Sequence, residues 1–276
     1  MREFFRRLFR KKLNIFCLFL FAVIVLMILF ANFVAPYGPD DQDIMAKNLA
    51  PSLQHLAGTD HLGRDVFSRI LYGGRVSLSI GIFASVVTTL AGAIIGSISA
   101  YFGGKVDNVI MRLCDVFMAM PPMLMAMAIV AALGQGVFNT LLAVILSGIP
   151  MRAYVARGPV LALRNQEFIE AATAVNTPTW KIILTHIIPN IMAPLIVQST
   201  LAISGTITSV AGLSFLGLGI QPPNPEWGAM LSAGRNYLRD YPWQVLGPGI
   251  AMFLTLFSLN VLGDGVRDAL DPKLKD

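Results

Sequence analysis

Charged side chains are scarce in this chain. Asp, Glu, Lys and Arg make up 13% of its 276 residues, whereas hydrophobic residues make up 55% and the mean hydropathy is +0.66. A soluble globular domain has roughly a quarter charged residues. The composition therefore excludes an ordinary soluble domain and predicts a polytopic α-helical membrane protein.

Cysteine and histidine are also rare. The two cysteines, Cys17 and Cys114, lie in or beside apolar segments without a CxxC spacing, and the three histidines are scattered along the chain. Such spacing argues against both a disulfide framework and a zinc site. We therefore predict no metal ligands and no catalytic residues.

A phosphate-binding loop of the type GxxxxGK[ST] is missing from the sequence. In many ATPases the backbone of that loop cradles the phosphates of the nucleotide. We therefore expect that this chain by itself is not an enzyme, holds no cofactor and does not hydrolyse ATP.

Six apolar segments approach the roughly 20 residues that a helix needs to cross a bilayer. The first follows the basic start MREFFRRLFRKK and is too long for the core of a signal peptide, which predicts a retained membrane helix. The predicted spans are Leu13–Ala35, Val76–Tyr101, Val109–Leu133, Val137–Val155, Ile191–Leu213 and Gln244–Leu262.

The same pattern divides the chain into four parts. A basic tail with the first span covers 1–35, an outer loop covers 36–75, a core of five helices covers 76–264 and a cytoplasmic tail covers 265–276. No soluble domain is predicted.

The basic residues predict how the spans are oriented. Six Lys and Arg residues lie between Arg2 and Lys12, and the C-terminal end adds Arg267, Lys273 and Lys275. Since cytoplasmic segments carry an excess of Lys and Arg, both termini are predicted to lie in the cytoplasm, which agrees with an even number of spans.

Two patterns within the spans concern packing. The sequence GAIIG, from Gly92 to Gly96, has the spacing of small residues that lets two helices approach closely. Pro121 and Pro122 should kink the third span, because proline removes backbone hydrogen bonds.

One cytoplasmic stretch, FIEAATAVNTPTWKIILTHIIPN (168–190), indicates two short helices with a break between them. Asn176 tolerates the left-handed conformation that ends a helix. Thr177 then fits an N-cap and Pro178 the first position of a new helix. A plain connector between spans is one interpretation. A connector needs only a few residues, however, so the length favours a docking element for a cytoplasmic partner.

This stretch resembles the EAA loop of ATP-binding-cassette (ABC) importer permeases, placed here at about residues 158–190. Glu170, Ala171 and Ala172 match its start, and Asn176 stands where the usual glycine is found. Three further motifs narrow the resemblance to the second-permease branch of the dipeptide, oligopeptide and nickel permeases: GTDHLGRDVFSRILYGGRVSLSIG, LSFLGLGIQPPNPEWGAML and LNVLGDGVRDALDPKLKD.

The resemblance implies an all-α fold with six transmembrane helices, the type I ABC importer (MetI-like) permease fold, in the bacterial cytoplasmic (inner) membrane. It also implies two sites. The residues expected to couple to an ATPase subunit are Glu170, Ala171, Ala172, Asn176, Thr177, Pro178, Thr179 and Trp180. The residues expected at an outer gate or at a contact with a binding protein are Pro222, Pro223, Glu226 and Trp227.

The partners that the resemblance implies are a second permease subunit, one or two nucleotide-binding subunits that carry ATP and Mg, an extracytoplasmic substrate-binding protein and the lipid bilayer; nucleic acid is not among them. The expected cargo is a di- or oligopeptide, with nickel or a metal–chelator complex as the alternative. A stand-alone secondary transporter or channel, and an intramembrane enzyme, are alternatives of other classes. They would need buried ionisable residues midway through the spans or a reactive pair at bilayer depth.

Overall fold

The computed structural model describes residues 6–270, so that Arg2, Lys273 and Lys275 lie outside the described residues. Over this range the chain is helical, and the one β-bridge joins Thr59 to Asp65. Five helices are long and apolar enough to cross a membrane, and one bent pair makes a sixth span if it is counted as one. The predicted all-α, six-span class is thereby confirmed. The five helices are α2 (Lys12–Leu29), α4 (Val66–Phe102), α7 (Val137–Leu163), α11 (Met192–Phe215) and α13 (Trp243–Leu270).

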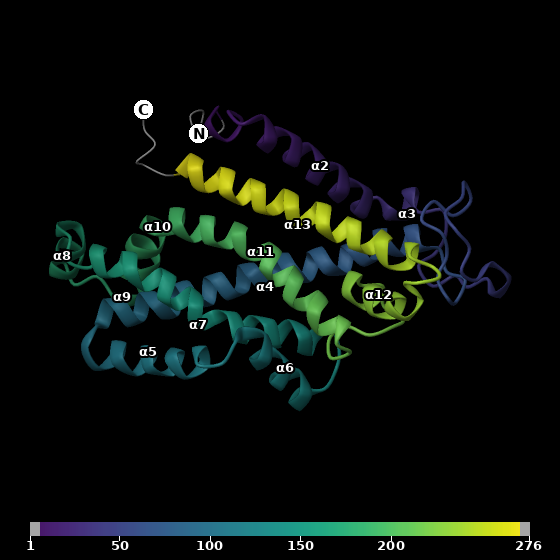
Figure 1. Ribbon diagram of the computed structural model, residues 1–276. Helices are drawn as coiled ribbons and strands as arrows, with labels where there is room; N and C mark the ends of the chain where they lie inside the picture. Colours follow the sequence, from purple (N-terminus) through teal and green to yellow (C-terminus); the bar gives the residue numbers. More distant parts are fainter. Residues whose placement is uncertain (1–5, 271–276) are drawn as a thin grey trace.

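The long helices run side by side between two ends of the molecule (Figure 1). At the end that we call the hairpin end lie α8 (Glu167–Ala174) and α9 (Thr179–Ile182), beside the start of α2 and the end of α13. The opposite end, which we call the loop end, holds residues 36–65 and the short helices α3 (Ala31–Val34), η1 (Ile44–Ala46), α12 (Trp227–Gly234) and η3 (Arg235–Tyr237).

The two ends of the described chain are joined at the hairpin end. The Lys11 ammonium and the Asp268 carboxylate form an ion pair of 2.7 Å. This contact raises the pKa of the Lys11 amine, because the neighbouring carboxylate stabilises its charged form. An even number of crossings follows from this arrangement.

Helix α4 begins ten residues before the predicted start of the second span. The Asp65 carboxylate caps it by accepting a hydrogen bond of 2.7 Å from the Ser68 backbone N–H. Residues 66–75 lie in the segment assigned to the outer loop, near whose end a short helix was expected; they are the first turns of α4 rather than a separate helix. With 37 residues α4 is about 55 Å long, since a helix rises 1.5 Å per residue, and it extends beyond the bilayer core.

The third span is broken rather than merely kinked. Helices α5 (Gly104–Met118) and α6 (Pro122–Leu133) meet at an angle of 85°. Pro121 adopts an extended conformation, as expected of a residue that precedes another proline, and neither proline can donate a backbone hydrogen bond. The interruption predicted at Pro121–Pro122 is present, and the bend there is sharper than a kink within one helix.

Helices α4 and α7 pack closely through the predicted small residues. A Cβ added at Gly92 would lie 2.2 Å from the Arg152 Cβ, and one added at Gly96 would lie 2.2 Å from the Ala153 carbonyl oxygen. No side chain fits in either place. The close approach predicted from GAIIG is therefore confirmed.

Candidate functional site

The break in the cytoplasmic stretch is a Schellman motif at the end of α8. Asn176 has a φ of 60° and lies in the left-handed region. Its N–H donates to the Thr173 carbonyl at 2.9 Å, and the Thr177 N–H donates to the Ala172 carbonyl at 3.0 Å. These two bonds satisfy carbonyls that a helix end leaves without partners. Asn176 thus adopts the left-handed conformation for which glycine is usually found, as predicted.

The second helix of the hairpin starts one residue later than predicted. Helix α9 begins at Thr179, Pro178 is its N-cap, and no side chain caps it. The Pro178 carbonyl accepts hydrogen bonds from Lys181 and Ile182. Thr177 is therefore not the N-cap, because it lies two residues before the first helical residue and its side chain accepts no hydrogen bond from α9.

Helix α9 continues into two further helical pieces. A π-helical turn, η2 (Ile183–Ile187), leads into α10 (Ile188–Asn190), and α11 follows after Ile191. Pro189 has no N–H to donate, and a single π-turn is a common way for a helix to pass such an interruption. The helical path thus leads from the hairpin directly into a membrane span.

The inner face of the hairpin is anchored in an apolar core. Ile169 and Ala172 of α8 and Ile182 of α9 are buried, and they share one cluster with Ala100 of α4 and Val160 of α7. The hairpin is therefore packed against α4 and α7, and Leu195 of α11 belongs to the same cluster.

The outer face of the hairpin is exposed. Trp180 is 64% exposed and Val175 is 76% exposed, and the side chains of Glu170 and Ala171 also face out. Glu170 lies in the first turn of α8, where a negative charge is favourable for the helix dipole. Of the eight coupling residues predicted from sequence, Ala172 is the one that packs inward, which makes it a support of the hairpin rather than part of its surface.

At the loop end, the four residues predicted for an outer gate fall into two groups. Pro222 and Pro223 are exposed and joined by a cis peptide bond. Glu226 and Trp227 are fully buried. The Glu226 carboxylate caps α12 by accepting from the Ala229 N–H at 2.9 Å and also accepts from the Ser77 hydroxyl at 3.0 Å. Within this chain Glu226 and Trp227 are interior residues, which position the exposed prolines.

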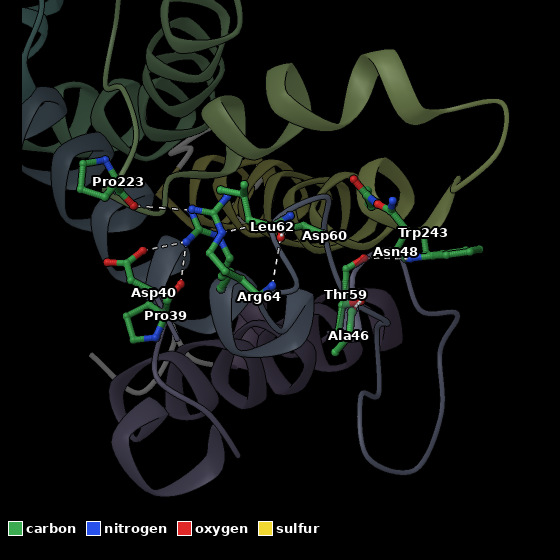
Figure 2. Close-up of polar contacts among 12 residues, drawn as sticks. Pro39, Asp40, Ala46, Asn48, Thr59, Asp60, Leu62, Arg64, Pro223 and Trp243 are labelled. Carbon is green, nitrogen blue, oxygen red and sulfur yellow. Dashed lines mark hydrogen bonds and ion pairs between the residues drawn. The ribbon is translucent and has the colours of Figure 1, made fainter. Parts of the chain in front are cut away.

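The outer loop is tied to the helices around it by polar contacts (Figure 2). The Arg69 guanidinium donates to the Pro39 carbonyl at 2.5 Å, to the Asp40 carboxylate at 2.9 Å and to the Pro223 carbonyl at 3.5 Å. The Trp243 indole N–H donates to the Thr59 carbonyl at 3.2 Å. These hydrogen bonds hold the first outer loop, the second outer loop and the start of α4 together, and we call this assembly the braced unit.

His61 belongs to this braced unit and stacks on Tyr237, with ring centroids 5.1 Å apart. Burial lowers the pKa of its imidazole below the usual value, against the opposing effect of the Asp60 carboxylate. The imidazole is therefore held in the neutral form at neutral pH.

The structure also shows charges that the sequence did not single out. Asp107 of α5 is buried and accepts from Arg157 of α7 at 2.7 and 2.5 Å. Arg152 lies inside α7. For Arg152, a charge within the predicted span Val137–Val155 was the available signal.

In residues 6–270 no three His, Cys, Asp or Glu side chains come together in a group that could hold a metal ion.

The Arg112 and Asp115 charges, three residues apart on α5, lie 4.0 Å from each other. The Tyr154 hydroxyl donates to the same Asp115 carboxylate.

The fold defines the class: a polytopic α-helical membrane protein with a capped helical hairpin packed against one end of its spans. The chain belongs to the family described as binding-protein-dependent transport system inner membrane components, which matches residues 92–276. Residues 1–51 match the N-terminal TM domain of oligopeptide transport permease C.

Individual relatives agree with this assignment. The glutathione transport system permease protein GsiD of Escherichia coli O6:K15:H31 is 43% identical over 274 residues, which are 99% of this chain and 90% of the relative. The dipeptide transport system permease protein DppC of Alkalihalophilus pseudofirmus is 42% identical over the same shares.

A solved structure has the same fold. A chain of the MetNI methionine ABC transporter, in an inward-facing conformation, superposes with a TM-score of 0.58 at 13% identity, over 73% of this chain and 96% of that chain. The MetI-like fold and the resemblance to ABC importer permeases are thereby confirmed. The chain is a multi-pass inner-membrane permease, a transport component.

Proposed function

We propose that this permease imports peptide-type cargo and forms the translocation path together with a second permease subunit. The observation that carries the proposal is the similarity over 99% of the chain to relatives named for glutathione and dipeptide transport. The nickel or metal–chelator alternative has no observation of its own in its favour.

ATP hydrolysis belongs, in this proposal, to one or two nucleotide-binding partner subunits, which bind ATP and Mg. Their docking site is the exposed face of the hairpin, from Glu170 to Trp180. Trp180 and Val175 supply apolar surface for a groove on the partner, while the Schellman motif and the buried isoleucines keep the hairpin rigid. A rigid element is needed because the partner's motion must reach α4, α7 and α11.

The hairpin end, and with it both termini, is then cytoplasmic. The concentration of Lys and Arg before α2 supports this orientation. The loop end faces outward, and the exposed Pro222 and Pro223 are the part of the predicted gate that is available to a substrate-binding protein.

Uptake by the complete importer, reconstituted in proteoliposomes, tests the cargo. Labelled dialanine or glutathione should accumulate when ATP, the binding protein and all subunits are present. If neither peptide is taken up, the proposed cargo class is wrong.

Charge reversal at Glu170 tests the docking site. Glu170→Lys should reduce uptake by about tenfold or more and weaken co-purification of the ATPase subunit, since an unpaired charge at a buried contact is costly. Asp240→Lys, an equally exposed reversal at the loop end, serves as the control for co-purification. A Glu170→Lys importer that assembles and transports like the parent would show that the hairpin is not the docking element.

A further inference from the structure

Arg152 lies inside α7, one of the helices long and apolar enough to cross a membrane. It is two residues past the middle of α7, about 22 Å from Val137 and about 16 Å from Leu163 along the helix axis. The hydrocarbon core is roughly 30 Å thick. A charged side chain at this depth is costly and is retained where it faces a partner or a water-filled passage.

Arg152 differs in its partner from three other arginines that are buried or partly buried. Arg64, Arg69 and Arg157 each pair with a carboxylate at 2.5 to 2.9 Å. The Arg152 guanidinium donates a long hydrogen bond of 3.4 Å to the Gln198 amide oxygen on α11. Within residues 6–270, Arg152 forms no ion pair. The side chain is only partly buried. This cation thus lacks an anion.

The surface of α11 that begins at Gln198 gives a second, independent observation. Gln198, Gly205, Ser209 and Gly212 follow one another at spacings of seven, four and three residues, which places them on one face of the helix. A Cβ added at Gly205 would meet nothing within 4 Å. This face carries small residues and the polar side chains of Gln198 and Ser209, and it is open at Gly205, whereas Met123 covers it at Gly212. A lipid-facing surface would be apolar.

Helix α4 packs against the base of the Arg152 side chain. Because a Cβ at Gly92 would lie 2.2 Å from the Arg152 Cβ, the base of the side chain is held between α4 and α7. The guanidinium at the other end of the side chain reaches Gln198 on α11.

We propose that Arg152 receives a carboxylate of the cargo midway along the translocation path, and this inference rests on the proposed import of peptides. A guanidinium binds a carboxylate through two parallel hydrogen bonds, and every unmodified peptide has a C-terminal carboxylate. Gln198 is a weak, neutral partner that holds the guanidinium until a carboxylate of the cargo replaces it. Because Arg152 is partly solvated, this carboxylate can leave again.

The test compares dialanine with its C-terminal amide in the reconstituted importer at saturating concentrations, with uptake divided by the amount that the binding protein holds. Arg152→Gln should lower dialanine uptake by about tenfold, the factor that corresponds to one hydrogen bond to a charged group. Arg152→Lys should keep most of the rate because it keeps the charge. The amide should move at the reduced rate in the parent and show no further loss in Arg152→Gln.

The controls separate this role from a structural one. Arg267→Gln, the same change at an exposed position near the end of α13, should behave like the parent. Subunit co-purification and ATPase activity should survive in Arg152→Gln. The inference is overturned if Arg152→Lys and Arg152→Gln lower dialanine uptake equally, or if dialanine and its amide are affected alike or not at all. It is also overturned if the second permease no longer co-purifies with Arg152→Gln, which would make Arg152 a subunit contact. A parent importer that moves no peptide refutes the cargo class before any variant is made, and this inference with it.

Discussion

At the scale of single residues, the environment of Glu226 shows how burial changes a role. This glutamate follows three prolines in an outer loop, and from the sequence it was expected at a gate or at a contact with a binding protein. In the structure it caps α12 and holds the Ser77 hydroxyl of α4, which in turn accepts from the Trp227 N–H at 3.3 Å. A single side chain thereby joins the second outer loop to the longest helix.

Glu226→Ala should lower the free energy of unfolding by about 2–3 kcal/mol, because it removes a cap and leaves the buried Ala229 N–H without a partner. Glu226→Gln keeps an acceptor oxygen and should cost less than half as much. Unfolding titrations in mixed micelles measure both. Equal stability of the Ala variant and the parent would contradict the central position given to this side chain.

At the scale of elements, the contact between α4 and α7 depends on glycines that face backbone. Gly96 lies so close to the Ala153 carbonyl that a methyl group has no room, whereas an added Cβ at Gly158, on α7 itself, meets nothing within 4 Å. These two glycines form a matched pair, since one is required by packing and the other is not.

Gly96→Ala should therefore destabilise the protein by about 1–3 kcal/mol, because the two helices must separate to admit the methyl group. Gly158→Ala should be neutral or stabilising by up to about 1 kcal/mol, since alanine is the better helix former. Thermal unfolding of the two variants in detergent provides the comparison. A Gly96→Ala variant as stable as the parent would mean that the helices are not held at this distance.

At the scale of the whole molecule, the described chain starts and ends at the same side of the spans. The Lys11–Asp268 ion pair fixes this arrangement, and the braced outer loops lie at the far side. Which side faces the cytoplasm follows from the proposed orientation, and it can be measured directly.

Cysteine labelling tests the orientation with little background, because Cys17 and Cys114 are 0% and 6% exposed. Met45, which is 91% exposed at the loop end, should as Met45→Cys react with a membrane-impermeant maleimide added from outside. Lys105→Cys, exposed at the hairpin end, should react only after the membrane is opened. Reaction of Lys105→Cys in sealed cells would reverse the proposed topology.

Several features could be predicted from the sequence because they depend on local chemistry. The few charges and long apolar runs gave the membrane class, and the length of each run gave the number of spans. The left-handed turn at Asn176 and the interruption at Pro121–Pro122 are properties of those residue types. The hairpin was found for the same reason, although the start of its second helix was misplaced by one residue.

Other features depend on contacts between residues far apart in the chain, and only the tertiary structure decided them. The buried Glu226 carboxylate accepts a hydrogen bond from Ser77, 149 positions away. The Arg152 guanidinium contacts the neutral Gln198, 46 positions away, rather than a carboxylate. The size of the bend before α6, 85°, was likewise known only from the structure. A sequence pattern states which residues can turn, cap or cross a membrane, but burial and pairing are decided by neighbours that the fold brings together.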